Sequence, residues 1–423
     1  MSADIVREKL DDLFGDEFAP MPAEGGAFDL APLRAALSAL GDPHKRLPKS
    51  VHVAGTNGKG STIAFMQAIA DAAGISAHVF SKPHLFKVNE RIRLGGALAT
   101  DYSLLSAIDR VHATGARLRH FEAQVAAALL LFAEHEGDLL LLETGVGGLE
   151  DATNVIAQPA LSLITPVDFD HAALLGDSLE EIAAHKAGIL KPGAPAIIAR
   201  QRPQAAAIIE AHAAELGAPL LRQGVEWDCY NSHGRLAVQT DTRLLDLPAP
   251  ALFGAHQFDN AGAAVVAMLT LGDQRIDERA LARGVAQAFL PARMQRASHT
   301  EREIWIDGAH NPHGARALAA AIAALNSRAP KRTILILGIR PRKDAAAFLE
   351  ALGSCGDALI ATPISGVESL PADALRAMAK RRDVEAAASL DEAFVIATRD
   401  ADARIVVCGS LALAAEALAQ IAG

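Results

Sequence analysis

Residues 55–62 read GTNGKGST and bring glycines, a lysine and hydroxyl side chains together in one short segment. The common phosphate-binding loop has the pattern G-x-x-x-x-G-K-[ST]. Here Gly60 follows Lys59, so the hydroxyls of Ser61 and Thr62 come late. A glycine-rich turn between a buried strand and a helix directs backbone N–H groups at one point, where the helix N-terminus adds partial positive charge. An ordinary strand-to-helix turn is the alternative, but the order of strand, loop, lysine and hydroxyl favours a phosphate site.

Such a site requires ligands for Mg²⁺, which prefers hard oxygen atoms. Glu143 ends the apolar segment LLLLE, His171 follows the next apolar segment, and Ser81 ends the segment AHVFS. Parallel sheets bind ligands beyond the carboxyl ends of their strands, so we expect all three at one sheet edge. Each has another interpretation: an exposed strand-end acid for Glu143, a structural or solvated imidazole for His171, and a turn residue for Ser81.

The elements that must position these residues alternate along the chain. Apolar segments predict strands at residues 50–55, 76–81, 137–145, 160–167, 194–200, 303–310, 332–339, 357–364 and 403–410. Helical patterns cover residues 61–73, 178–188, 315–325 and 345–352, and Ser178 with Glu181 forms a capping box. This alternation indicates an α/β fold with a mostly parallel sheet and a second, smaller α/β unit. We expect the joint near the polar segment 295–300.

Composition excludes several classes of protein. The formal net charge is −10 and basic runs are short, so we expect no nucleic-acid partner. The three cysteines, Cys229, Cys355 and Cys408, are far apart, which favours a reducing cytoplasm over a disulfide framework. The N-terminal segment carries acids within its apolar pattern, so neither a signal peptide nor a membrane span is expected. We expect a soluble, cytoplasmic monomer with no membrane partner.

A set of motifs occurs in one order over roughly residues 28–411: HVAGTNGKGST, FSKPHL, NERIR, HFE, LLETGVGG, EDATNV, HKAGI, GAHQFDNA, PARMQ, DGAHNP and CGSL. Together they resemble the folylpolyglutamate synthase/dihydrofolate synthase family of the Mur ligase superfamily. The resemblance implies an N-terminal, P-loop-containing ATP-binding domain with the pteroate site over residues 1–296. A smaller Rossmann-like α/β domain over residues 297–423 would close the ATP and glutamate cleft.

The implied activity is that of an ADP-forming acid–amino-acid ligase. Enzymes of this family use ATP to phosphorylate a carboxylate of dihydropteroate or a reduced folate, and the amine of L-glutamate then forms the amide. The implied cofactors are two Mg²⁺ ions and a carbamylated Lys186. The sequence alone places Lys186 near a helix C-terminus, where a cation is favourable. The resemblance makes Lys59, Lys186 and His171 the catalytic residues.

The remaining site residues also follow from the resemblance. ATP binding is implied for Thr56, Asn57, Gly58, Lys59, Gly60, Ser61, Asn260, Arg293 and Asp307, and Mg²⁺ binding for Ser81, Glu143 and His171. Binding of the pteroate or of glutamate is implied for Asp29, Leu30, Phe121, Glu122, Asp151, Ala152 and His310. We expect Gly60 to let the chain turn past the phosphates before the helix begins.

The chain departs from the family pattern in two segments. Leu149-Glu150 stand where a basic residue usually follows the double glycine, and Arg342-Lys343-Asp344 stand in place of DKD. Both departures concern the acceptor substrate rather than ATP. Three alternatives remain open: a family member with one of the two activities, another Mur-type amino-acid ligase, and a nucleotide-binding regulator without ligase activity.

Overall fold

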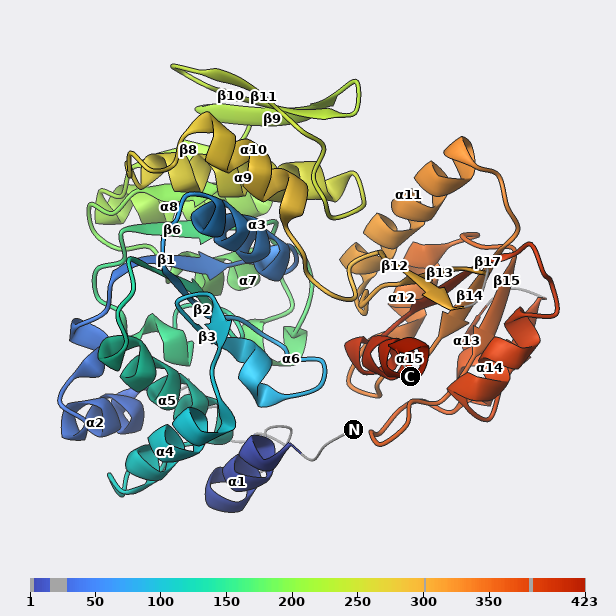
Figure 1. Ribbon diagram of the computed structural model, residues 1–423, viewed down its shortest axis with the longest axis horizontal. Helices are drawn as coiled ribbons and strands as arrows, with labels where there is room; N and C mark the ends of the chain where they lie inside the picture. Colours follow the sequence, from blue (N-terminus) through green and yellow to red (C-terminus); the bar gives the residue numbers. More distant parts are fainter. Residues whose placement is uncertain (1–3, 16–28, 300–301, 380–382, 423) are drawn as a thin grey trace. The chain divides into compact units, whose positions relative to one another are not determined.

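The computed structural model describes residues 4–15, 29–299, 302–379 and 383–422 (Figure 1). The chain forms two compact units. The first comprises residues 1–251 and 258–289, and the second comprises residues 252–257 and 290–423. Each contains a largely parallel sheet with helices packed against it, so the predicted α/β fold class is confirmed.

The first unit is built on an eight-stranded sheet in the order β4-β3-β2-β5-β1-β6-β7-β8. Its strands are β1 (Lys49–Ala54), β2 (Ala77–Phe80), β3 (Ile92–Leu94), β4 (Ala97–Leu98), β5 (Leu139–Glu143), β6 (Leu161–Ile164), β7 (Ala196–Ile198) and β8 (Leu220–Arg222). Only β3 and β4 run antiparallel to their neighbours. In the register of the central strands Val53 pairs with Glu143 and with Leu163, so β1, β5 and β6 end level with one another.

Helices cover this sheet and build its core. They are α1 (Ile5–Phe14), α2 (Ala31–Ala39), α3 (Lys59–Ala72), α4 (Asp101–His112), α5 (His120–Glu134), α6 (Ala172–Leu175), α7 (Leu179–Ala187), α8 (Pro203–Leu216), α9 (His256–Thr270) and α10 (Glu278–Gln287). Helices α2, α4 and α5 pack in one apolar cluster with β2 and β5, while α7 and α8 pack in another with β6 and β7. The predicted capping box of α7 is confirmed, since Ser178 and Glu181 exchange hydrogen bonds.

The sequence interpretation missed a small antiparallel sheet of β9 (Trp227–Ser232), β10 (Arg235–Thr240) and β11 (Leu244–Leu247). His233 and Gly234 form the turn between β9 and β10, both with positive φ. A two-residue turn of this kind matches the twist of a hairpin. The pair His-Gly between short alternating segments was the available signal.

The second unit contains a six-stranded sheet in the order β12-β13-β17-β14-β15-β16. Its strands are β12 (Gln295–His299), β13 (Arg302–Ile306), β14 (Thr333–Leu337), β15 (Ala358–Ala361), β16 (Val384–Ala386) and β17 (Arg404–Cys408). Its helices are α11 (Pro312–Arg328), α12 (Ala345–Leu352), α13 (Ala372–Met378), α14 (Leu390–Ala397) and α15 (Leu411–Ala422). The four strands predicted in this part of the chain are confirmed.

The polar segment near residue 295 is a strand. β12 pairs antiparallel with β13 at the edge of the second sheet, and the predicted boundary at 296/297 falls inside it. Polar residues are common on edge strands because one side of such a strand faces solvent. The polarity of this segment led us to predict a joint between domains, whereas the segment forms an edge strand. Among the described residues no helix is long and apolar enough to cross a membrane.

Candidate active site

The loop between β1 and α3 depends on two glycines. Gly55 has φ 142°, and a Cβ atom there would lie 1.8 Å from Thr165 Oγ1. Gly58 caps α3 with φ 95°, and a Cβ atom there would lie 2.5 Å from Asn260 Oδ1. The turn therefore needs glycine at both positions, and Asn260 packs against the loop, while its role in nucleotide binding stays a prediction.

The helix begins at Lys59, which corrects one sequence expectation. Gly60 is the second residue of α3 rather than part of the turn that precedes it. The change of direction takes place at Gly58, whose left-handed backbone conformation is cheap only for glycine. The expectation that Gly60 makes this turn is therefore wrong.

Side chains of the loop reach neighbouring strand ends. Lys59 Nζ donates to Gly55 O at 3.0 Å and to Thr56 O at 3.2 Å, and lies 4.0 Å from Glu143 Oε1. Thr56 Oγ1 donates to Asp168 O and accepts from Asp168 N, which ties the loop to the segment after β6. These contacts hold the loop at the carboxyl edge of the sheet.

Hydroxyl and amide side chains complete the loop. Ser61 and Thr62 are buried in the first turn of α3, and Asn57 is half-buried. Thr62 Oγ1 is enclosed with no hydrogen-bond partner among the described residues. A buried hydroxyl without a partner is costly, so a bound oxygen ligand at the loop would relieve that cost.

Two of the three predicted Mg²⁺ ligands lie together. Glu143 is only 3 % exposed at the end of β5, and its Oε2 accepts the backbone N–H of Lys82, directly after Ser81. His171 instead caps the short helix α6, with its side chain 43 % exposed and its Nε2 3.9 Å from Asp170 Oδ1. Within the described part of the chain, no three His, Cys, Asp or Glu side chains form a metal-binding group. The Ser81, Glu143 and His171 set stays a prediction.

Lys186 lies at the loop rather than at an exposed helix end. Its side chain is buried in α7, and Nζ donates to Gly55 O at 3.0 Å, the same carbonyl that Lys59 contacts. Burial and, to a smaller extent, the nearby charge of Lys59 lower the pKa of Lys186 to about 7, although Asp170 and Asp151 oppose the shift. An amine with this pKa is partly neutral near pH 7 and can act as a nucleophile.

An aromatic side chain and a carboxylate flank the turn after β5. The ring of Phe121 would lie 2.5 Å from a Cβ atom at Gly145, and Asp151 Oδ2 would lie 3.0 Å from the same position. Asp151 accepts hydrogen bonds from Val146 N, Thr153 N and Thr153 Oγ1. Phe121 and Asp151 therefore adjoin one turn, and their roles in acceptor binding stay predictions.

The other predicted acceptor residues have contacts within the chain. Both carboxylate oxygens of Glu122 accept from Arg119, which caps α5. Asp29 Oδ1 accepts Ala31 N, and Leu30 precedes α2 and packs against the core. Ala152 is buried at the start of the short 3-10 helix η3 (Ala152–Val155). Their roles in acceptor binding stay predictions.

The second unit brings three predicted residues together near the end of β13. Asp307 accepts from Met294 N through Oδ2 and from Ala309 N through Oδ1. Arg293 Nη1 donates to Ala292 O and would lie 2.8 Å from a Cβ atom at Gly308. His310 Nδ1 is 2.8 Å from Gly308 O. The segment before β12 that carries Arg293 thus lies against the segment after β13 that carries Asp307 and His310.

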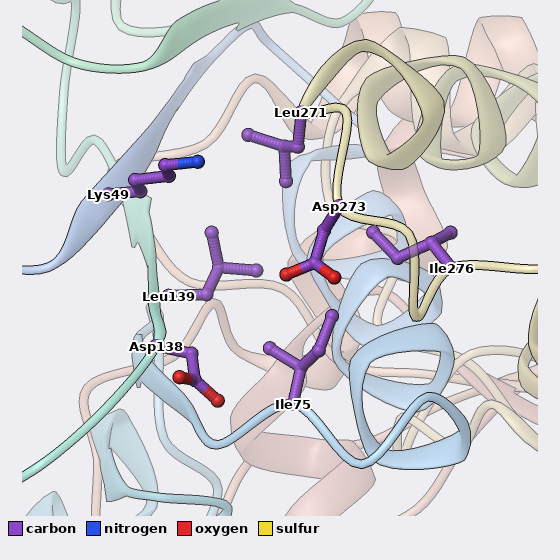
Figure 2. A pocket seen from close by; sticks show the side chains of 7 residues that line it. All are labelled: Lys49, Ile75, Asp138, Leu139, Leu271, Asp273 and Ile276. Carbon is purple, nitrogen blue, oxygen red and sulfur yellow. The ribbon is translucent and has the colours of Figure 1, made fainter.

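A shallow pocket in the first unit is separate from this site. Its lining residues are Lys49, Ile75, Asp138, Leu139, Leu271, Asp273 and Ile276 (Figure 2). Lys49 and Leu139 begin β1 and β5, so the pocket lies at the opposite edge of the sheet from the loop. Arg275 bridges Asp138 and Asp273 at 3.0 and 2.7 Å beside it. These ion pairs connect surface loops, so the charged residues around the pocket have a structural role that requires no ligand.

Sequence reasoning missed Lys82. Its Nζ lies 4.5 Å from the centroid of the Phe121 ring, while its backbone N–H donates to Glu143. The available signal was a lysine directly after Ser81 within FSKPHL, next to a predicted metal ligand.

The parallel sheet, the glycine loop and the two lysines at Gly55 define an α/β protein with a nucleotide-type phosphate loop. The family model "Mur ligase middle domain" matches residues 53–268, and "Mur ligase, glutamate ligase domain" matches residues 292–411. Folylpolyglutamate synthase of Lacticaseibacillus casei is 33 % identical over 89 % of this chain and 91 % of its own. Dihydrofolate synthase/folylpolyglutamate synthase of Escherichia coli is 33 % identical over 86 % and 85 %.

Solved structures agree with these sequence relatives. E. coli FolC in complex with DHPP and ADP has a TM-score of 0.88 at 30 % identity, over 99 % of this chain and 97 % of that one. A bifunctional folylpolyglutamate synthase/dihydrofolate synthase with Mn, AMPPNP and L-glutamate bound has a TM-score of 0.84 at 30 % identity, over 95 % and 96 %. The chain therefore belongs to the folylpolyglutamate synthase/dihydrofolate synthase family of Mur ligases.

Proposed function

We propose that this protein is an ATP-dependent ligase that joins L-glutamate to dihydropteroate, to a reduced folate, or to both. The observation that supports it most directly is the convergence of Lys59 and Lys186 on Gly55 O beside the buried Glu143. A cation, Lys59, and a buried carboxylate, Glu143, beside a glycine loop suit the handling of a transferring phosphoryl group. The relatives, which are folylpolyglutamate and dihydrofolate synthases, support the choice of glutamate and folate as substrates.

The reaction needs activation because a carboxylate oxygen is a poor leaving group. In the proposed sequence an acceptor carboxylate oxygen attacks the γ-phosphorus of ATP, which releases ADP and leaves an acyl phosphate. The amine of L-glutamate attacks the acyl carbon, the bond from that carbon to the phosphate oxygen breaks, and the amine loses a proton. Lys59 would hold the phosphate charge through both steps, and the loop N–H groups would orient it.

The donor set at the loop fits a divalent cation. Glu143, Ser81 and the buried hydroxyl of Thr62 are oxygen donors of the kind Mg²⁺ prefers. When bound, Mg²⁺ would neutralise charge on the phosphate oxygens. We infer two Mg²⁺ ions, with Ser81, Glu143 and His171 holding one and a carbamylated Lys186 the other.

Carbamylation of Lys186 is a separate part of this proposal. The neutral Nζ attacks the carbon of CO₂ and loses a proton, which gives a carbamate anion. The lowered pKa of Lys186, about 7, supports the presence of that neutral amine at physiological pH. Protein equilibrated with ¹³C-bicarbonate should give a carbamate carbon signal in NMR, and the Lys186→Ala variant should lack it. The same spectrum from both proteins would contradict the assignment.

The function is tested with purified protein, ATP, Mg²⁺ and L-glutamate by measuring ADP release. Dihydropteroate and a tetrahydrofolate are supplied separately, so that turnover with one or both decides between a single and a dual activity. Turnover with a UDP-muramyl acceptor and none with either pterin would favour a different Mur-type ligase. ADP release no higher than background with all acceptors would refute ligase activity.

We further propose that the protein acts in the cytoplasm as a monomer. The odd number and wide spacing of Cys229, Cys355 and Cys408 in the sequence support a reducing compartment. Light scattering of the purified protein should give the mass of one chain, 44.2 kDa. A mass of two chains would contradict the monomer.

A further inference from the structure

Lys82 links two parts of the candidate active site. Its backbone N–H donates to Glu143 Oε2 at 3.1 Å, and its ammonium lies over the Phe121 ring at 4.5 Å from the centroid. Phe121 in turn lies against Gly145 beside Asp151. The Lys82 backbone is therefore tied to the carboxylate predicted to bind Mg²⁺, and its ammonium lies over the ring predicted to stack on the acceptor.

The segment that carries Lys82 is fixed from both ends. Glu90 accepts the backbone N–H groups of Leu85, Phe86 and Lys87. Arg91 is buried, and it donates to His84 Nδ1 and to Gln124 Oε1 on α5, the helix that also carries Phe121. Because α5 holds both the ring and the anchor of the segment, Lys82 is preorganised relative to Phe121.

The acceptor needs a positive partner in this region. The carboxylate that becomes phosphorylated must stay ionised and in place while it approaches a phosphate that is itself negative. Leu149 and Glu150 offer no cation on the neighbouring turn, where the apolar Leu149 side chain is exposed instead. An ammonium held at the Phe121 ring suits an aryl carboxylate, since an acceptor ring that contacts Phe121 brings its attached carboxylate to the charge.

We propose that Lys82 positions the acceptor by pairing with its aryl carboxylate, the group that receives the phosphoryl. This inference rests on the proposed function and assigns a residue to acceptor recognition. It differs from a purely structural role, in which the ammonium only holds the Phe121 ring through a cation–π contact. The two roles differ in whether the effect of Lys82 depends on the charge of the ligand.

The test combines proteins that have or lack a positive charge at residue 82 with ligands that have or lack a negative charge. Calorimetry with AMPPNP and Mg²⁺ measures the binding of dihydropteroate and of its neutral carboxamide to the wild type, Lys82→Met and Lys82→Arg. The wild type and Lys82→Arg should bind the carboxylate at least about tenfold more tightly than the carboxamide, and Lys82→Met should lose that preference. Lys87→Met, in the same segment, should keep it.

Kinetics give a second readout. Lys82→Met should raise KM for the acceptor about tenfold or more while KM for ATP stays within about twofold. If Lys82→Met weakened the binding of dihydropteroate and of its carboxamide equally, the proposed pairing would be wrong. Lys82 would then act through its contact with the Phe121 ring, and the proposed function would be unaffected. Failure of the wild type to bind dihydropteroate or its carboxamide would overturn the assignment of Lys82, and the proposed function would then depend on turnover with a tetrahydrofolate.

Discussion

Position 55 in the loop has no room for any side chain, so it requires glycine. Replacement by alanine would place a methyl group 1.8 Å from Thr165 Oγ1, in a backbone conformation already costly for other residues. We expect Gly55→Ala to lower the free energy of unfolding by about 3 kcal/mol or more and to abolish ATP binding. Urea unfolding and calorimetry measure the two effects.

Gly74→Ala is the matched control for that substitution. Gly74 also has a positive φ, 68°, but nothing lies within 4 Å of its Cβ position. The free energy of unfolding of Gly74→Ala should fall by only about 1 kcal/mol, which is the cost of the backbone conformation alone. Equal losses in the two variants would show that collision with Thr165 is not what requires glycine in the loop.

Lys59 is expected to act in chemistry rather than in folding. Lys59→Ala should lower kcat at least about a hundredfold, because a cation at the transferring phosphoryl group is lost, while the unfolding curve stays close to that of the wild type. Steady-state ADP release and circular dichroism measure these quantities. Lys49→Ala, at the other end of β1, should retain full activity; normal turnover by a folded Lys59→Ala protein would contradict the role.

The buried ammonium of Lys186 predicts a pH-dependent stability difference. Burial is the main cause that lowers its pKa from the ordinary value of 10.5 to about 7, so between these values the unfolded chain keeps a proton that the folded chain has lost. The buried charge therefore destabilises the folded state most below pH 7, and this destabilisation disappears as the pH rises toward 10.5. Lys186→Met should therefore gain stability relative to the wild type, most at pH 7 or below.

That gain should shrink by at most about 1.4 kcal/mol for each pH unit above 7. The measurement is urea unfolding of both proteins at several pH values in CO₂-depleted, Mg²⁺-free buffer, where the amine stays unmodified. A difference that is constant from pH 7 to pH 9.5 would show that the Lys186 amine titrates in its ordinary range.

At the scale of elements, an ion network joins β13, β17 and α11 at the start of the second sheet. Arg404 is 1 % exposed, and it donates to Glu303 Oε1 at 2.7 Å and to Asn326 Oδ1. Burial raises the pKa of Glu303, but hydrogen bonds from Arg404, Trp305 and Lys331 outweigh it and lower the pKa to about 2. The carboxylate therefore adds stability above pH 4.5 that is lost as the pH falls toward 2.

Glu303→Gln should accordingly lower the free energy of unfolding by about 3 kcal/mol at pH 7, since a buried guanidinium loses its counter-charge. Glu385→Gln removes an exposed partner of Arg399 at 3.4 Å and should cost at most about 0.5 kcal/mol. Urea unfolding at pH 7 compares the two. A loss in Glu303→Gln as small as in Glu385→Gln would show that the network is not stabilising.

At the scale of the whole molecule, binding of ATP should stabilise the fold by mass action. A ligand present at a hundred times its Kd adds about 2.7 kcal/mol to the free energy of unfolding. We expect a higher melting temperature with ATP and Mg²⁺, and smaller rises when EDTA removes the metal or in Lys59→Ala. Differential scanning fluorimetry measures the shift, and an unchanged melting temperature in the wild type would contradict nucleotide binding.

Much of the fold could be predicted because local pattern and tertiary environment agree. The segment LLLLE is apolar throughout, and β5 is buried along its whole length in the centre of the sheet. Ser178 and Glu181 cap α7 through contacts within one turn, which need nothing distant in sequence. The polar strand β12 and the hairpin of β9 and β10 were missed because pairing with a neighbouring strand, rather than apolarity, makes them strands.

The sequence by itself determined the chemistry of the loop: its glycines, Lys59 and the hydroxyls follow one another, so their order shows what they can bind. Which residues from distant parts of the sequence lie beside the loop was decided by the tertiary structure alone. Lys186 matches a helix-end cation in sequence, yet the packing of α7 buries it and brings Nζ to Gly55 O. Lys82 likewise reaches Phe121 only because β2 and α5 pack in one core. Burial and approach between distant segments depend on packing, which one-dimensional spacing does not encode.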